Sequence, residues 1–255
     1  FKNAEALENL HRVDTVVLDK TGTLTTGRPA VTDVLPQAAS KEALLQIAAS
    51  LESKSEHPFA KAILAAVKMD FPEPEAFKTI PGMAELGVAI PDFSSLAAQG
   101  KTPLYFASED GKYIGAIAAA DVLKPDSVSA VRAMQSRHLD VVMLTGDNQQ
   151  TAQAIAAKAG ISHVISDVLP TEKAGAVKKL QEEGHRVLMV GDGINDAPAL
   201  VTADVGMAIG AGTDIAIESA DIVLMNSSLS AVSSAIALSR ATIRNIKENL
   251  FWAFF

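Results

Sequence analysis

The fold of this chain is decided by residues 13–25, which read VDTVVLDKTGTLT. Residues 13–18 are mostly apolar and β-branched and predict a buried strand, and the glycine-containing segment after them predicts a turn. The turn would hold Asp19 at the carboxyl end of a sheet strand, where open α/β folds bind their ligands. A carboxylate there can attack phosphorus, and neighbouring lysine and hydroxyl groups can hold phosphate oxygens. If only three residues of this turn matched, a surface turn after a strand would be the better interpretation. The seven residues 19–25 in this order instead favour phosphoryl chemistry.

The composition narrows the class of protein. A chain of 255 residues can form one large domain or two modest ones. Its net charge of −8 argues against a nucleic-acid partner. Because the chain has no cysteine, disulfides, a thiol nucleophile and a thiolate metal site are all excluded. An acidic protein that binds an anion such as ATP needs local positive charge, so the lysines near the motifs become important.

Apolar strands and helical patterns alternate through the second half of the chain. The predicted strands are 140–144, 163–165, 186–190, 205–207 and 222–224, and the predicted helices are 126–137, 149–159, 170–184 and 229 to the end. Such alternation predicts an α/β fold, with a Rossmann-like, doubly wound parallel sheet and helices on both of its faces.

Residues 34–116 interrupt this alternation and predict an inserted α+β domain. One helix begins at Ser40 and another near His57, and the strands 102–107 and 113–119 form a predicted hairpin. A helix N-terminus attracts anions, so the polar segment before the second helix is a candidate binding site. A polar turn between two helices is the simpler explanation of that segment taken alone.

The chain ends on the apolar residues 250–255, after a helical pattern with Arg240, Arg244 and Lys247 on one face. No uninterrupted apolar run reaches the ~18–20 residues of a membrane span. A basic stripe before an apolar end is typical of a cytoplasmic helix that enters a bilayer, and a solvated basic face is the alternative. We expect residues 239–255 to form a helix that leads into a truncated transmembrane segment.

Three of the strands end in a carboxylate within a glycine or threonine turn: Asp19, Asp147 and Asp192. Parallel strands bring their carboxyl ends to one edge of the sheet, and carboxylates that share a small site repel one another unless a cation lies among them. Oxygen ligands without histidine or cysteine favour Mg²⁺. Lys173, at a helix N-terminal turn, could reach this edge and neutralise a phosphate.

These motifs resemble those of the P-type ATPases, the ion pumps of the haloacid dehalogenase superfamily. The matching segments are 19–25, 145–147 and 191–198, within a resemblance that covers about 10–33 and 117–235. It implies a phosphorylation domain in two parts, 1–33 and 117–238, around a nucleotide-binding insert at 34–116. The crossings near 33 and 117 would act as hinges.

The resemblance also implies roles for single residues. Asp19 would be the nucleophile that becomes an aspartyl phosphate, and Mg²⁺ would be held by Asp19, the carbonyl of Thr21 and Asp192. Thr145 and Lys173 would bind the phosphoryl oxygens. The supporting residues would be Thr23, Gly146, Asp147, Asn195 and Asp196.

The segment Ser55-Glu56-His57-Pro58 resembles the heavy-metal-transporting branch of the family, in which the insert binds ATP. By this resemblance Glu52 and His57 contact the adenine end, Glu56 lies nearby, and Gly82 begins a glycine-rich nucleotide loop. The family places a second loop glycine at position 84, where this sequence has alanine. Either the nucleotide domain is trimmed or residues are missing between Met83 and Ala84, and we favour the second explanation.

Residues 245–254 look most like the copper(I) exporters. We therefore expect the ATP-binding, autophosphorylating portion of a copper pump, on the cytoplasmic side of a multi-pass membrane protein. The implied partners are ATP, Cu⁺ held by membrane segments outside this chain, and the actuator and transmembrane domains of the full-length pump.

Two other functions remain as alternatives. A soluble Mg²⁺-dependent phosphatase of the same superfamily usually has a second aspartate two residues after the nucleophile, where this chain has Thr21. A regulatory nucleotide-binding module would not need Asp19, Lys173 and Asp192 to be intact.

Overall fold

The computed structural model describes residues 1–37, 39–53, 55, 58–67, 71, 91–108, 111–192, 194–210 and 218–254. The chain forms two compact units, one made of Phe1–Thr26 with Leu123–Phe255 and the other of Gly27–Val122. The crossings expected near residues 33 and 117 lie inside two long strands, β2 (Thr25–Pro36) and β4 (Tyr113–Leu123).

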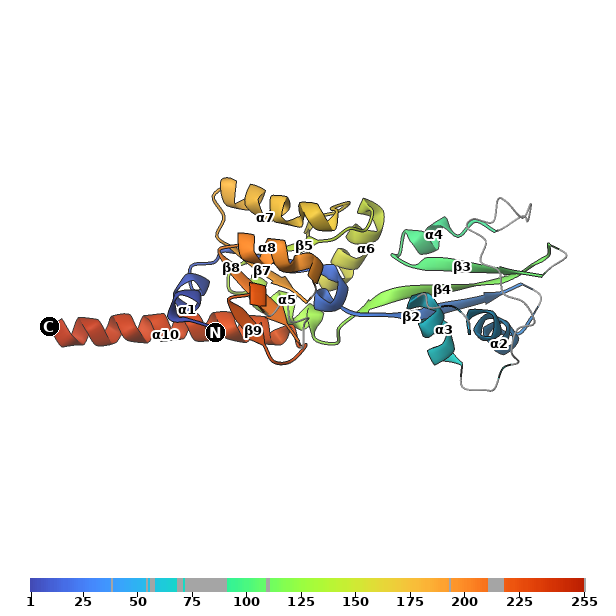
Figure 1. The fold of residues 1–255 in the computed structure, drawn as a ribbon, viewed down its shortest axis with the longest axis horizontal. Coiled ribbons are helices and arrows are strands. Elements are labelled where there is room, and N and C mark those ends of the chain that lie inside the picture. Colours follow the sequence, from blue (N-terminus) through green and yellow to red (C-terminus); the bar gives the residue numbers. More distant parts are fainter. Residues whose placement is uncertain are drawn as a thin grey trace. The chain divides into compact units, whose positions relative to one another are not determined.

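The first unit contains a six-stranded sheet in the order β6-β5-β1-β7-β8-β9 (Figure 1). Its strands are β1 (Thr15–Asp19), β5 (Asp140–Leu144), β6 (His163–Ile165), β7 (Val187–Gly191), β8 (Val205–Ile209) and β9 (Ile222–Leu224). Every neighbouring pair is parallel. The predicted α/β fold with a doubly wound parallel sheet is confirmed.

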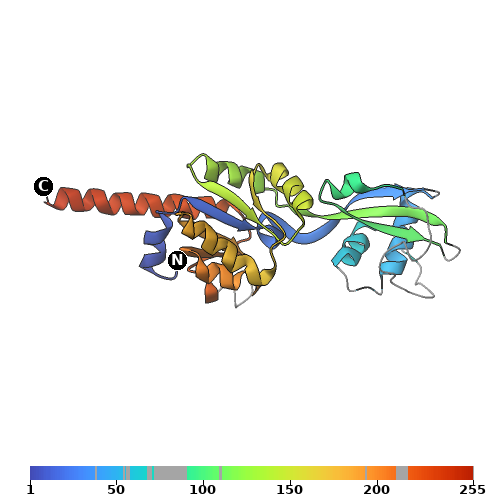
Figure 2. The same ribbon diagram turned by 90° about the horizontal axis from the view of Figure 1, so that it is seen from above.

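The helices of this unit cover both faces of the sheet (Figure 2). They include α1 (Ala4–Leu10), α5 (Ser127–Gln135), α6 (Gln149–Ala159), α7 (Lys173–Glu182), α8 (Ala197–Thr202) and α10 (Ser230–Phe254). Alternate residues of a strand point to opposite faces, so Val16 and Leu18 of β1 pack with α1, α5, α6 and α10, whereas Val17 packs with α7 and α8. The strand is buried along its whole length because both of its faces are covered.

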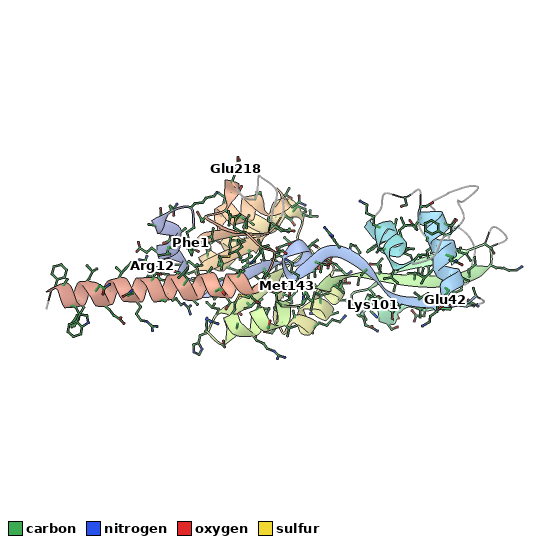
Figure 3. All side chains as sticks on the ribbon, turned by 90° about the horizontal axis from the view of Figure 1, so that it is seen from below. Phe1, Arg12, Glu42, Lys101, Met143 and Glu218 are labelled. Atoms are coloured by element: carbon green, nitrogen blue, oxygen red, sulfur yellow. The ribbon has the colours of Figure 1, made fainter. Side chains whose placement is uncertain are left out.

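Strand β1 lies between β5 and β7, and this order brings three strand ends together. Asp19 is level with Leu144 of β5, and Leu18 is level with Val190 of β7. Met143, which is labelled in Figure 3, lies one residue before the end of β5, and its side chain is fully buried. The loops that follow β1, β5 and β7 therefore leave the same edge of the sheet side by side.

The second unit contains a three-stranded sheet in the order β2-β4-β3, in which β3 (Thr102–Ala107) pairs antiparallel with β4. Its described helices are α2 (Lys41–Glu52), α3 (Pro58–Ala66) and α4 (Ser94–Ala97). Ser40 caps α2 as predicted, because its side chain accepts a hydrogen bond from the N–H of Ala43 at 3.1 Å. Leu44 of α2 approaches β4 so closely that a Cβ on Gly115 would lie 2.6 Å from it.

Helix α10 is fastened to the first unit near its middle. Ser239 donates a hydrogen bond to the carbonyl of Leu7, and Arg240 donates to the carbonyls of Val13 and Arg137. Arg240 thus binds backbone, unlike the exposed Arg244. Of the helices in the described part of the chain, none is both long enough and apolar enough to cross a membrane.

Candidate active site at the carboxyl edge of the parallel sheet

A buried lysine joins two aspartates at this edge. The ammonium of Lys173, at the start of α7, lies 2.6 Å from a carboxylate oxygen of Asp19 and 2.6 Å from one of Asp196. The side chains of these three residues are between 3% and 10% exposed. Residues far apart in the sequence are thus held in one dry cluster, and Asp19 ends the central strand as predicted.

The turn after β1 is shaped by Gly22. Residues Lys20–Leu24 form an irregular helical turn, in which Gly22 has a left-handed φ of 75°. A Cβ at Gly22 would lie 1.6 Å from a carboxylate oxygen of Asp192. A side chain at this position would therefore displace Asp192 as well as strain the backbone. Glycine allows the turn and the carboxylate to occupy neighbouring space.

Asp19, Asp192 and Asp196 form an acidic cluster. Each can offer one carboxylate oxygen, and these oxygens all lie within 4.8 Å of one another. Asp196 comes close because Gly191 leaves room, since a Cβ there would lie 2.6 Å from its carboxylate. From the sequence, Asp19 and Asp192 are expected to share the metal site and Asp196 only to support it, whereas the structure places all three together.

The cluster carries more negative charge than its lysine offsets. Burial, aided by the negative charge of Asp196, raises the pKa of Asp19 to about 7 although Lys173 opposes the rise. Burial and Asp196 also raise the pKa of Asp192, against the opposing charges of Lys124 and Lys173. For Lys173, burial lowers the pKa, but the two carboxylates outweigh burial and raise it.

This donor set fits a hard divalent cation. Its three carboxylates offer only oxygen ligands, which Mg²⁺ prefers. A cation among them would offset the burial and the nearby negative charge that raise the pKa values of Asp19 and Asp192. The Asp cluster is thus consistent with the predicted Mg²⁺ site.

The loop after β5 adds Thr145, Gly146 and Asp147 to this edge. Thr145 is buried, and its hydroxyl oxygen accepts a hydrogen bond from the N–H of Asp147 at 3.1 Å. The carboxylate of Asp147 lies 2.9 Å from the ammonium of Lys20, which joins this loop to the turn after β1. Gly146 is exposed beside them. The hydroxyl of Thr23 is fully buried and has no hydrogen-bond partner among the described residues.

The remaining predicted site residues lie on other elements or outside the described part of the chain. Asn195 is exposed in a short 3₁₀ turn (Ile194–Asp196). Glu52 is the last residue of α2 in the second unit. Glu56, His57 and Gly82 lie outside the described residues, as do Met83 and Ala84. The predicted adenine pocket stays a prediction.

Lys124 is a charged residue near this cluster that the sequence did not single out. Its side chain is buried directly after the end of β4. Its positive charge opposes the rise in the pKa of Asp192 that burial causes. Its backbone N–H donates to the carbonyl of Leu24 at 3.2 Å, next to the turn that holds Asp19. The available signal was a lysine directly after an apolar strand, but its segment was interpreted only as the return to the α/β part.

The comparisons with known proteins agree with this fold. The family model of the haloacid dehalogenase-like hydrolases matches residues 13–204, so the chain belongs to that family. Within it, the chain belongs with the catalytic portions of heavy-metal P-type ATPases, on the evidence of the following relatives.

The chain is 46% identical over 280 residues to the copper-exporting P-type ATPase of Bacillus subtilis (strain 168), covering 99% of the chain and 35% of that protein. It is 47% identical over 281 residues to copper-transporting ATPase 2 of Rhizobium meliloti (strain 1021), covering 100% of the chain and 34% of that protein. The chain therefore spans about a third of the length of these relatives.

Two solved structures extend the comparison. A zinc-transporting PIB-type ATPase in its E2.Pi state superposes with a TM-score of 0.86 at 35% identity, over 96% of this chain and 44% of that chain. The catalytic domain of the CPx-ATPase CopB-B superposes with a TM-score of 0.70 at 30% identity, over 92% of this chain and 94% of that chain.

Proposed function

We propose that this chain binds ATP and accepts its γ-phosphoryl group on Asp19, as the catalytic part of a copper(I)-exporting P-type ATPase. The observation that carries the proposal is the buried contact of Lys173 with Asp19 and Asp196, beside Asp192 at one sheet edge. A carboxylate at a strand end, next to a fixed ammonium, suits nucleophilic attack on phosphorus.

In the proposed step, a carboxylate oxygen of Asp19 forms a bond to the γ-phosphorus while the bond from that phosphorus to the bridging oxygen of ADP breaks. Lys173 would offset the charge on the transferring oxygens, and Thr145 and Gly146 would donate hydrogen bonds to them. A bound Mg²⁺ would supply further charge stabilisation, and its proposed ligands are Asp19, the carbonyl of Thr21 and Asp192, with the carboxylate of Asp196 within reach.

The supporting residues have proposed roles as well. Lys20 and Asp147 would hold the two loops in register through their ion pair. Thr23 would fill the buried space beneath the turn, and Asn195 would face the phosphoryl group from the loop after β7. Thr21 has no carboxylate to activate water, so the aspartyl phosphate should persist, which suits a pump better than a phosphatase.

The remaining expectations concern the whole protein. We propose that the second unit binds ATP with Glu52, Glu56, His57 and Gly82, and that this portion lies on the cytoplasmic side of a membrane. We further propose Cu⁺ as the cargo, since the curated relatives are copper transporters. Activation of the full-length protein by Cu⁺ but not by Zn²⁺ is the expected result, and the reverse order would contradict the copper assignment.

A labelling experiment tests the phosphoryl transfer. The chain is incubated with γ-labelled ATP, with Mg²⁺ or with a chelator, and then quenched in acid. We expect a label that needs Mg²⁺, survives acid, is cleaved by hydroxylamine and disappears in Asp19→Asn. A label that persists in Asp19→Asn would contradict the proposal, because another residue would then be the acceptor.

A further inference from the structure

One residue in the loop between β6 and α7 has an unusual backbone conformation. Among the described residues, His138 and Asp167 are the two non-glycine residues with positive φ, at 59° and 57°. An L-residue pays free energy for this left-handed conformation, which therefore persists only where the surrounding structure imposes it. His138 lies in the turn before β5, at the amino edge of the sheet, whereas Asp167 lies at the carboxyl edge.

The left-handed residue turns the chain toward the loop after β5. The N–H of Asp167 donates to the carbonyl of Asp147 at 2.8 Å, and the next N–H, that of Val168, donates to the carbonyl of Thr145 at 3.2 Å. The N–H of Thr145 donates in return to the carbonyl of Ile165 at 3.0 Å. Successive amides of a strand point to opposite sides, so a strand that simply continued could not aim both at one loop.

Close packing accompanies these hydrogen bonds. A Cβ on Gly146 would lie 3.2 Å from the carbonyl oxygen of Val168, so the two loops are in contact at this glycine. The side chain of Val168 is buried against Val17 and Leu144, which anchors the loop in the core. The loop that follows Asp167 is therefore fixed from both sides.

The same loop leads directly to Lys173. The carboxylate of Glu172 accepts a hydrogen bond from the N–H of Leu169 at 3.2 Å, and this local ring starts the turn Pro170–Glu172 before α7. Lys173 is the next residue and contacts Asp19. One short segment thus connects the backbone of Thr145 and Asp147 to the lysine of the cluster.

The carboxylate of Asp167 is exposed and has no hydrogen bond or ion pair with the described residues. Its backbone, and not its charge, makes the contacts above. We propose that Asp167 is a positioning residue, whose left-handed backbone fixes the loop 145–147 relative to Lys173 for phosphoryl transfer. This inference rests on the proposed function of the site.

The test compares Asp167→Val with His138→Val in the 255-residue chain. Both changes put a β-branched residue at a left-handed position, so they impose the same backbone strain at opposite edges of the sheet. We expect Asp167→Val to slow aspartyl-phosphate formation at saturating ATP by about tenfold or more, with an unchanged half-saturating ATP concentration. His138→Val should leave the rate within about twofold.

Rescue variants separate the effect of the backbone conformation at Asp167 on the rate from the effect of its carboxylate. Asp167→Gly and Asp167→Asn accept the left-handed conformation and should keep the wild-type rate. Equal slowing in Asp167→Gly and Asp167→Val would overturn the inference, as would equal slowing in the two valine variants. If Asp167→Val does not fold, Asp167→Ala strains the same φ less severely and should give the same order of rates.

Amide hydrogen exchange gives a readout that needs no phosphoryl transfer. The amide of Val168 should exchange about tenfold faster in Asp167→Val and unchanged in His138→Val, because only the first change disturbs its bond to Thr145. Unchanged exchange in Asp167→Val would overturn the inference even if labelling succeeds. Absence of label in the wild type would instead contradict the proposed function and leave the exchange result to decide the positioning.

Discussion

The two edges of the parallel sheet treat the same residue type in opposite ways. At the carboxyl edge, Asp19 is buried with Asp192 and Asp196, and burial raises its pKa to about 7. At the amino edge, burial alone would raise the pKa of Asp204, but donors from Gln181, the backbone of Val187 and Arg186 together lower it. The carboxyl edge carries more negative charge than Lys173 neutralises. At the amino edge, hydrogen-bond donors and Arg186 offset the charge of Asp204.

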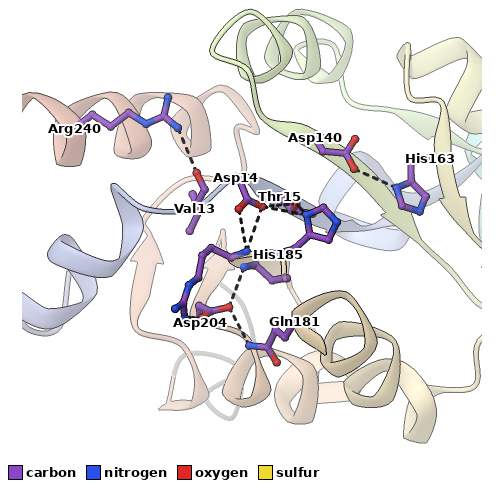
Figure 4. Close-up of polar contacts among 11 residues, drawn as sticks. Val13, Asp14, Thr15, Asp140, His163, Gln181, His185, Asp204 and Arg240 are labelled. Carbon is purple, nitrogen blue, oxygen red and sulfur yellow. Dashed lines mark hydrogen bonds and ion pairs between the residues drawn. The ribbon is translucent and has the colours of Figure 1, made fainter. Parts of the chain in front are cut away.

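The amino edge is a network of short polar contacts (Figure 4). Asp14 accepts from the backbone N–H of Arg186 at 3.2 Å and lies 3.3 Å from His185. Asp140 lies 3.2 Å from His163. These pairs are half exposed, so water screens them and little free energy depends on any one of them.

The charged residues at the two edges of the sheet therefore have different roles. Charges at the amino edge tie strand ends together and should tolerate replacement, while those at the carboxyl edge should cost stability unless a ligand or ion offsets them. Perturbed carboxylates that face one another in this way are typical of catalytic sites. Substitutions at the two edges should therefore separate activity from stability.

The largest expected effect follows from Lys173→Met. Removing the ammonium leaves Asp19 and Asp196 buried without their partner, so we expect the free energy of unfolding to fall by about 3–5 kcal/mol. Aspartyl-phosphate formation should slow by about 10²–10³-fold, since a fixed donor to the transferring group is lost.

Urea unfolding and acid-quenched labelling measure the two effects. Lys178→Met on the same helix is the matched control, because Lys178 is exposed. Equal losses of stability and of labelling rate in the two variants would show that the contacts of Lys173 with Asp19 and Asp196 contribute neither to stability nor to phosphoryl transfer.

The second largest effect is expected from replacing Gly22, and Gly160 is its control because the two glycines have similar left-handed φ angles. Gly22 has a φ of 75° and Gly160 a φ of 79°, but a Cβ would meet Asp192 at the first position and nothing within 4 Å at the second. Both Gly→Ala changes should cost about 1–2 kcal/mol of stability from the left-handed backbone. Only Gly22→Ala should also slow labelling, by about 10²-fold, because it displaces Asp192. Similar labelling in the two variants would break the comparison.

The smallest effect lies at the amino edge and depends on pH. Asp204 has a lowered pKa when folded, so its ionised form stabilises the fold above the ordinary carboxyl value of 3.8, and this stability is lost as the pH falls through the lowered pKa. Asp204→Asn should lower the free energy of unfolding by about 1 kcal/mol at pH 7, with labelling unchanged.

Urea titrations at pH 7 and at successive lower pH values check this sign. The wild type and Asp204→Asn should converge as the pH approaches the lowered pKa of Asp204, and a gap that widens there would contradict the assignment. Asp140→Asn is the control, because its contact with His163 is half exposed and is screened by water.

Much of the fold was predictable because its signals are local. The strands β1, β5 and β7 are short apolar runs that end in glycine or threonine turns, and parallel pairing alone brings Asp19 and Asp192 to one edge. Helix α2 was marked by Ser40, whose capping role needs only its neighbours in sequence.

The missed features depend on tertiary contacts. Asp196 enters the cluster through the space beside Gly191, and the left-handed backbone of Asp167 is held by carbonyls of another loop. Arg240 fits a basic stripe in the sequence, yet its guanidinium donates to the carbonyls of Val13 and Arg137. No periodicity or spacing within one segment contains this information.

The central claim is that phosphoryl chemistry belongs to one end of β1 and not the other. Asp14 immediately precedes the strand and Asp19 ends it, so Asp14→Asn and Asp19→Asn make the same chemical change at opposite edges. The decisive measurement is acid-stable, hydroxylamine-sensitive label from γ-labelled ATP in both variants beside the wild type. We predict full label in the wild type and Asp14→Asn and none in Asp19→Asn, and label that survives in Asp19→Asn but disappears in Asp14→Asn would contradict the account.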